Sequence, residues 1–149
     1  MNTESAPIDE IHNRLFLRIH QSANLIHKKG SAALDALGVT TQQWAVLASL
    51  SRPHITNGMS INDMCDYLRV SRQSLSPMLQ RLEKAGYLQR VRDEIDQRSR
   101  RMILTPEGRA LLSAIAPIMQ SVYTQSLEGV SRDEQISIIH HLNLLLKNM

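Results

Sequence analysis

Arginines and short acids alternate closely between residues 90 and 101 of the chain. The arginines are Arg90, Arg92, Arg98, Arg100 and Arg101, and the acids among them are Asp93, Glu94 and Asp96. The flanking segments Tyr-Leu-Gln-Arg-Val and Met-Ile-Leu are typical of two strands joined by a charged tip. A basic hairpin of this kind can place an arginine in the minor groove of duplex DNA.

Within this tip, Asp96 stands two residues before Arg98. At that spacing we expect the carboxylate to brace the guanidinium of Arg98. A braced arginine loses less rotamer freedom when it enters a narrow, electronegative minor groove. The pair therefore predicts a groove contact by Arg98.

A second polar cluster opens the apolar-periodic segment that precedes the hairpin. Arginine can pair twice with guanine and glutamine twice with adenine, and an uncapped helix start offers N–H groups to phosphate. Short serines let the backbone approach the major groove closely. The predicted DNA-binding residues are Ser71, Arg72, Gln73, Ser74, Ser76, Asp96, Arg98, Arg100 and Arg101.

Two short helices must position the polar cluster, one beginning at Ser60 and one capped by Ser71 and ending at Gly86. Each has barely three turns and is too short to be stable alone. Their apolar faces must pack on each other and on a helix opened by the capping box Thr40-Thr41-Gln42-Gln43. A loop is expected from Ser51 to Met59. With the hairpin of residues 87–104, these helices predict a winged helix-turn-helix.

Long amphipathic helices are expected at both ends of the chain. Apolar residues recur every three or four positions from Ile8 to Ile26, and the stripe can continue to Leu37 with Gly30 inside the helix. Thr105-Pro106-Glu107 and the capping box Ser131 to Glu134 begin two more helices. A wing lobe of about 65 residues cannot cover such wide apolar faces. The sequence therefore predicts a homodimer.

These elements predict a mainly α chain with a small β-hairpin wing, in which the N- and C-terminal helices form a dimerisation region around a winged helix-turn-helix. The expected parts are an N-terminal dimerisation helix in residues 1–37, a DNA-binding lobe in residues 38–104 and C-terminal dimerisation helices in residues 105–149. The three parts form one intertwined domain, because the lobe and the arm share their packing.

Composition excludes several classes of protein. The 149 residues carry a formal charge of +3, which permits a phosphate-binding face, and no apolar run approaches the ~20 residues that span a bilayer. The N-terminus is polar and predicts no secretory signal. A single cysteine allows no internal disulfide, which fits the cytoplasm. No cofactor is expected.

Catalytic and metal chemistry are not indicated by any motif. The chain lacks a phosphate-binding glycine loop, a Gly-x-Ser-x-Gly elbow and a His-Glu-x-x-His pair, so no enzyme is predicted. The six histidines show no ligand spacing, and no metal site is expected. Cys65 is expected to be a structural thiol on an inner helix face. Two alternatives stay open: a redox-responsive DNA-binding regulator that uses Cys65, and a helical dimer adaptor that binds no DNA.

The order of these motifs resembles the multiple-antibiotic-resistance regulator (MarR) family of bacterial transcription factors. The matching segments are Gly38 to Leu47, Val70 to Leu75, Arg81 to Leu88, and Asp96-x-Arg98 followed by Leu104-Thr105-x-x-Gly108. The resemblance implies an obligate homodimer on a pseudo-palindromic DNA operator, with Arg72, Gln73 and Ser74 at the bases and Arg98 in the minor groove. Pro77 departs from the family pattern and is expected to bend the recognition helix.

The resemblance also implies a repressor that a small ligand releases from DNA. Trp44 can floor a pocket between the arm and the lobe, and Tyr123 is placed with it. Arg14 and Arg18, one helical turn apart, can hold an anionic or aromatic effector such as an aromatic carboxylate or its coenzyme A thioester. The alternative, in which both arginines face solvent or form ion pairs across the dimer, stays open.

Overall fold

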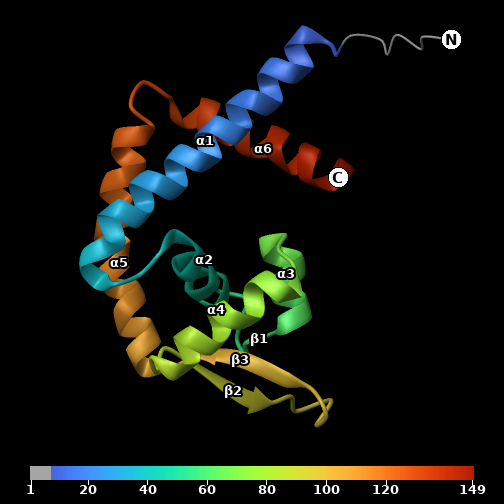
Figure 1. The fold of residues 1–149 in the computed structure, drawn as a ribbon, viewed down its shortest axis with the longest axis vertical. Helices are drawn as coiled ribbons and strands as arrows, with labels where there is room; N and C mark the ends of the chain where they lie inside the picture. The colour runs from blue at the N-terminus through green and yellow to red at the C-terminus, as the bar shows by residue number, and fades with distance from the viewer. Residues whose placement is uncertain (1–7) are drawn as a thin grey trace, which may run out of the picture.

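The computed structural model describes residues 8–149, and in them it confirms the predicted fold class. Six α-helices and a small three-stranded antiparallel sheet form a helical arm above a winged helix-turn-helix lobe (Figure 1). The N-terminal segment for which no secretory signal is predicted, residues 1–7, lies outside the described part. Within that part, no helix is long and apolar enough to cross a membrane.

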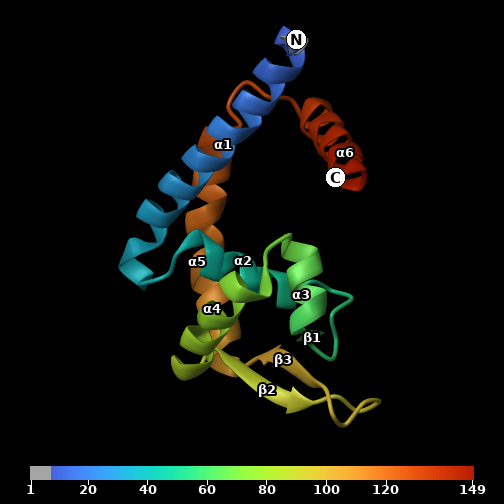
Figure 2. The same cartoon turned by 45° about the vertical axis from the view of Figure 1, so that its right-hand side comes forward.

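The arm consists of three helices: α1 (Glu10–Leu34), α5 (Pro106–Ser126) and α6 (Arg132–Asn148). Helices α1 and α5 pack on each other, and α6 turns back beside α1 (Figures 1 and 2). The α-helix predicted to reach Leu37 instead stops at Leu34, and a 3-10 turn, η1 (Asp35–Leu37), follows it. Gly38 ends this turn at a φ of 66°, a conformation that glycine adopts without a steric penalty.

The lobe contains the helices α2 (Thr41–Leu50), α3 (Ile61–Leu68) and α4 (Arg72–Lys84) and the strands β1 (Met59–Ser60), β2 (Leu88–Arg92) and β3 (Arg100–Leu104). The strand order is β1-β3-β2, and Leu88 pairs with Leu104. The hairpin formed by β2, β3 and the tip between them is called the wing below. It extends away from the helices (Figure 2).

The sequence did not predict β1, because a strand of two residues has no periodicity. Met59 pairs with Met102 of β3, where a loop was expected. The preceding Gly58 has a φ of +72°, and a Cβ there would lie 2.1 Å from the carbonyl oxygen of Met102. Only glycine therefore lets the chain approach β3 this closely.

The helix starts are those that the sequence predicts. The hydroxyls of Thr40, Ser60, Ser71, Thr105 and Ser131 each accept a hydrogen bond from the backbone N–H three residues later. Pro77 lies inside α4, yet the helix is assigned without interruption from Arg72 to Lys84. The hydroxyl caps therefore decide where the elements of the lobe begin.

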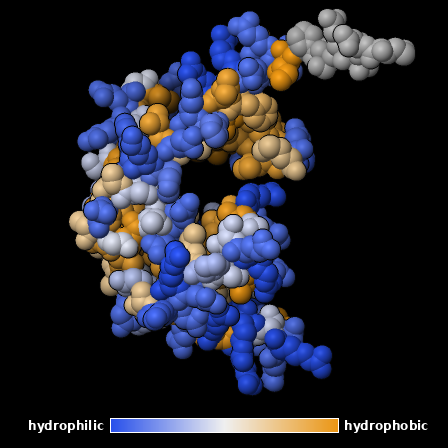
Figure 3. Space-filling view, viewed as in Figure 1, coloured by the Kyte–Doolittle hydropathy of each residue, from blue (hydrophilic) through white to orange (hydrophobic). Residues whose placement is uncertain are grey.

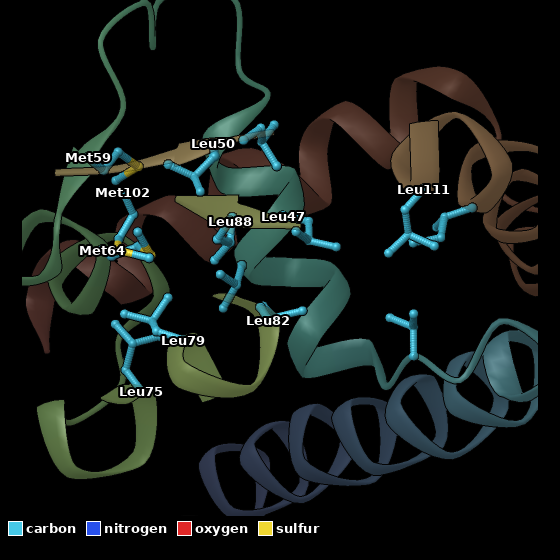
Figure 4. Packing of buried hydrophobic residues seen from close by; sticks show 14 of the residues in the cluster. Leu47, Leu50, Met59, Met64, Leu75, Leu79, Leu82, Leu88, Met102 and Leu111 are labelled. Atoms are coloured by element: carbon cyan, nitrogen blue, oxygen red, sulfur yellow. The ribbon is translucent and has the colours of Figure 1, made fainter. Parts of the chain in front are cut away.

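One hydrophobic core joins the lobe to the arm. Leu47, Met64, Leu75, Leu79 and Met102 are almost completely buried where α2, α3, α4 and the sheet meet (Figure 4). Leu111, Ile115 and Met119 extend this core along α5. The short lobe helices are thus stabilised by packing rather than by helix propensity.

The arm leaves wide apolar faces uncovered in the single chain. Helix α6 buries none of its residues. Hydrophobic side chains gather on the part of α6 that faces the opening between arm and lobe (Figure 3). The exposed apolar residues of the arm include Ile11, Leu15, Phe16, Ile26, Ile136, Ile138, Ile139, Leu142 and Leu146.

Candidate DNA interface

The first turn of α4 points away from the core, as the sequence predicts. Ser71 Oγ accepts the N–H of Ser74 at 3.1 Å and donates to the hydroxyl of Ser74 at 3.0 Å. Arg72, Gln73 and Ser74 are exposed, and Ser76 is half-buried. We call residues 71–74 the recognition turn. Its polar side chains are available to a partner, since Leu75 behind them faces the core.

A hollow lies between the recognition turn, the start of α3 and the wing. It has a volume of about 280 Å³, and we call it the arginine groove. Its lining residues are Ser60, Ile61, Asn62, Arg72, Arg90, Arg98, Ser99 and Arg100. Arg72 Nη1 donates to Asn62 Oδ1 at 2.7 Å, and Arg90 Nε donates to Glu83 Oε2 at 2.8 Å. Because one carboxylate pairs with Arg90, the groove keeps a net positive charge.

Asp93 organises the tip of the wing. Its Oδ1 accepts the N–H groups of Ile95 at 2.8 Å and Asp96 at 3.1 Å, and its Oδ2 accepts Arg101 Nη1 at 2.9 Å. Arg101 also donates to the carbonyls of Asn57 at 2.9 Å and Gly58 at 2.7 Å. The guanidinium of Arg101 therefore ties the tip to the loop before β1.

The expected brace between Asp96 and Arg98 takes another form. Asp96 Oδ1 accepts the backbone N–H of Arg98 at 3.1 Å rather than its guanidinium. The carboxylate thus shapes the turn that presents Arg98, whose side chain is exposed at the groove. The sequence identified the pair, but the spacing alone could not tell a backbone contact from a side-chain contact.

The N–H groups of Asp96 and Ile95, and then the guanidinium of Arg101, hold the pKa of Asp93 below its ordinary value of 3.8. A lowered pKa means that the charged carboxylate stabilises the folded tip at neutral pH. That stabilisation is lost as the pH falls below 3.8 through the lowered pKa.

We expect Asp93→Ala to loosen the wing tip at neutral pH, because it removes all three hydrogen bonds that Asp93 accepts. Asp93→Asn keeps one acceptor oxygen and loses the ion pair with Arg101, so its effect is smaller. Hydrogen exchange at the amides of Ile95 and Asp96 measures both. Equal exchange in the wild type and in Asp93→Ala would contradict this role.

The four residues expected to hold an effector do not line one cavity in residues 8–149. The rings of Trp44 and Tyr123 are in contact, with centroids 6.2 Å apart, and both are half-buried against the core. Arg14 and Arg18 are exposed and line a shallow hollow on α1, where Arg18 donates to Gln21 at 2.7 Å. The structure thus brings the aromatic pair together but places the arginines elsewhere.

A larger apolar cavity, which the sequence did not reveal, lies between arm and lobe. We call this space of about 600 Å³ the interlobe cavity. Its walls come from α1, α2, the end of α3 and α4, and its lining residues are Ala23, Asn24, Ile26, His27, Thr41, Gln42, Ala45, Val46, Leu68, Val70, Ser74, Leu75 and Met78. Ser74 belongs to both this cavity and the recognition turn. No local motif marks these residues, because they meet only after folding.

Other chemistry finds little support in the part of the chain that the structure describes. There, no group of three or more His, Cys, Asp or Glu side chains could hold a metal ion. Cys65 is half-buried and packs against the core, on the inner face of α3 where the sequence placed it.

Comparisons with known proteins agree with this geometry. Residues 39–108 match the sequence family described as a winged helix DNA-binding domain. The chain is 44% identical over 141 residues to the transcriptional activatory protein BadR of Rhodopseudomonas palustris, covering 94% of this chain and 81% of BadR. The structure resembles a MarR-family regulator from Silicibacter pomeroyi, with 27% identity, a TM-score of 0.73, and 88% and 86% of the two chains covered. This chain belongs to the MarR family.

A further MarR-type neighbour has been solved with DNA. AbfR of Staphylococcus epidermidis resembles this chain with 26% identity and a TM-score of 0.79, over 93% of this chain and 92% of AbfR. AbfR bound to DNA gives a TM-score of 0.72, with 93% of each chain covered. The MarR-family protein described here is therefore a DNA-binding transcriptional regulator rather than an enzyme.

Proposed function

We propose that this regulator binds a pseudo-palindromic operator as a homodimer and that a small ligand in the interlobe cavity changes its affinity for that operator. The observation that carries the proposal is the arrangement of the lobe, in which the recognition turn and the wing flank one positively charged groove. A protein that binds only other proteins has no use for such a groove, which argues against the adaptor alternative.

The apolar faces of the arm support the homodimer. Ile139 of α6 is 58% exposed and Ile11 of α1 is 66% exposed in the single chain. A two-fold axis through the arm would bury both faces and present two recognition turns about one DNA turn apart. Residues 1–37 and 105–149 are accordingly proposed as dimerisation segments around the lobe of residues 38–104.

Within the lobe, Gln73 and Ser74 are proposed to face base edges, with Ser76 close to the backbone. Arg98 is proposed to enter the minor groove next to the wing, and Arg100 to contact a phosphate. Asp96 and Arg101 are assigned a supporting role, because their hydrogen bonds go to the backbone of Arg98 and to the wing base.

Arg98→Ala is expected to weaken operator binding by about 1–3 kcal/mol with the fold intact, as for other groove-contacting arginines. Its exposed side chain makes no contact that holds the lobe together. Titration of labelled operator DNA measures the loss, and circular dichroism checks the fold. Arg132→Ala, which removes the same charge from the start of α6, is the control. Equal affinity of Arg98→Ala and the wild type would remove the wing from the mechanism.

The interlobe cavity is the proposed effector site, in place of the hollow beside Arg14 and Arg18. Its apolar wall fits an aromatic ring, and Asn24, His27 and Gln42 offer polar contacts to a carboxylate or thioester. A ligand there touches arm and lobe at once. It shifts the DNA-binding equilibrium only if it prefers one arrangement of the two.

The direction of regulation has two candidates. The family resemblance favours a repressor that blocks a promoter, whereas BadR, 44% identical to this chain, is named a transcriptional activatory protein. A reporter gene behind the operator separates them: deletion of the regulator raises expression if it represses and lowers expression if it activates.

Selection of bound fragments from genomic DNA, followed by titration at several salt concentrations, tests the proposal. We expect one enriched inverted repeat and an affinity that falls steeply with salt, since each neutralised phosphate releases counterions. Binding without a preferred site or without salt dependence would contradict it. Cys65→Ser with and without peroxide tests the redox alternative, which requires that only the wild type loses its DNA.

A further inference from the structure

The arginine groove separates the two elements that are proposed to read DNA. In a duplex, one sugar–phosphate backbone divides the major groove from the adjacent minor groove. A protein with its recognition helix in one groove and its wing in the other must therefore pass that backbone strand between them. The arginine groove is the hollow at that place, and its walls come from the recognition turn, the wing and the start of α3.

The side chain of Arg72 lies in this groove rather than along the axis of α4. Its Nη1 donates to Asn62 Oδ1 at 2.7 Å across the gap between α4 and α3. An amide oxygen fixes the guanidinium without neutralising it, which a carboxylate would do. Reading guanine requires two guanidinium donors on one base edge, and Arg72 already spends one donor on Asn62.

We propose that the arginine groove binds a phosphodiester of the DNA backbone and that Arg72, held by Asn62, is a ligand of that phosphate rather than a reader of bases. Asn62 is a positioning residue, since it acts through Arg72. This assignment rests on the proposed DNA-binding function and deepens it. It leaves base reading at the recognition turn to Gln73 and Ser74.

The other residues of the groove agree with a phosphate ligand. Arg98 and Arg100 line it from the wing, and Arg90 lines it with one donor given to Glu83. The first turn of α3 also reaches the groove, where the N–H groups of Ile61 and Asn62 have no carbonyl partner within the helix. Several donors thus converge on one hollow of about 280 Å³.

Arg72→Ala is expected to weaken the binding of operator and of random duplex DNA by the same factor, roughly five- to tenfold near 0.1 M salt. The slope of log affinity against log salt should become shallower by about one. Gln73→Ala is the matched contrast: it should lower the affinity for operator alone and leave the slope unchanged. If Arg72→Ala lowers only operator affinity and keeps the wild-type slope, Arg72 reads bases and the proposal fails.

Variants of Asn62 test the positioning role. Asn62→Ala should weaken both duplexes less than Arg72→Ala does, and the double variant should bind no worse than Arg72→Ala alone. Asn62→Asp, which has the same shape, should bind more weakly than Asn62→Ala, because a carboxylate neutralises Arg72 and repels phosphate. Additive losses, or equal binding by Asn62→Asp and Asn62→Ala, would show that Asn62 does not act through Arg72.

The wild type separates this inference from the proposed function. If the wild-type protein binds neither duplex, the DNA-binding proposal itself fails and the groove assignment fails with it. If the wild type binds both duplexes and Arg72→Ala is selective for operator, only the groove assignment is overturned. Arg132→Ala serves again as the charge control and should leave the salt slope at its wild-type value.

Discussion

Ile139→Asp in α6 is expected to convert the regulator from a dimer into a monomer and to lower operator affinity at least about 100-fold. The second half-site of an operator is bound at an effective concentration that the dimer sets, and its loss costs roughly 10²–10⁴ in affinity. Ile139 is 58% exposed and α6 buries no residue within one chain, so the substitution removes no core packing from the lobe.

Analytical ultracentrifugation measures the oligomeric state, and titration of operator DNA measures the affinity. Ser137→Asp is the matched control, because it adds the same charge to α6 two positions earlier, on the side of the helix away from Ile139. The control should remain dimeric and bind normally. A variant at Ile139 that stays dimeric, or a monomer with wild-type affinity, would contradict the proposed dimer.

Local chemistry explains why so much of the fold could be predicted from the sequence. The hydroxyl of Ser71 caps α4 and fixes which residues open it, and the alternation of apolar positions then fixes which face it buries. Cap and periodicity together determine that Gln73 faces outward. The same reasoning holds for Thr105 at α5 and Ser131 at α6, whose helices begin where predicted.

Contacts between distant segments account for what could not be predicted. Arg101 was expected to contact DNA, but its guanidinium meets the carbonyls of Asn57 and Gly58, more than forty residues earlier in the chain. Asn62 attracted no notice because its partner, Arg72, comes from the next helix. The interlobe cavity likewise forms from four helices, none of which carries a motif for it.

The family motif Leu104-Thr105-x-x-Gly108 has a physical basis at the junction between the wing and α5. Thr105 donates its N–H to the carbonyl of Tyr87 at 3.1 Å and its hydroxyl to the carbonyl of Gly86 at 2.6 Å, and the same hydroxyl accepts the N–H of Gly108 at 3.0 Å. Gly108 is buried, and a Cβ there would lie 2.2 Å from the carbonyl oxygen of Tyr87. The glycine thus lets α5 begin directly against the start of β2.

Gly108→Ala is expected to destabilise the protein by about 2 kcal/mol, although the same change in an open helix stabilises by about 1 kcal/mol. Backbone overlap wins, because the carbonyl of Tyr87 is held by Thr105 and cannot move without breaking that bond. Overpacking of this kind costs about 1–3 kcal/mol or more. Chemical denaturation at fixed protein concentration measures the free energy of unfolding.

Ala110→Gly, two residues further along α5, gives the helix-propensity contribution for the same turn and should cost only about 1 kcal/mol. If Gly108→Ala instead stabilises the protein, then Tyr87 can retreat and the close approach is not what the motif glycine provides. If it destabilises as expected, faster amide exchange at Thr105 should accompany the loss, because the displaced carbonyl of Tyr87 is the acceptor for that N–H. The wing would then lose its fixed attachment to the arm, and operator binding should weaken even where the protein remains folded.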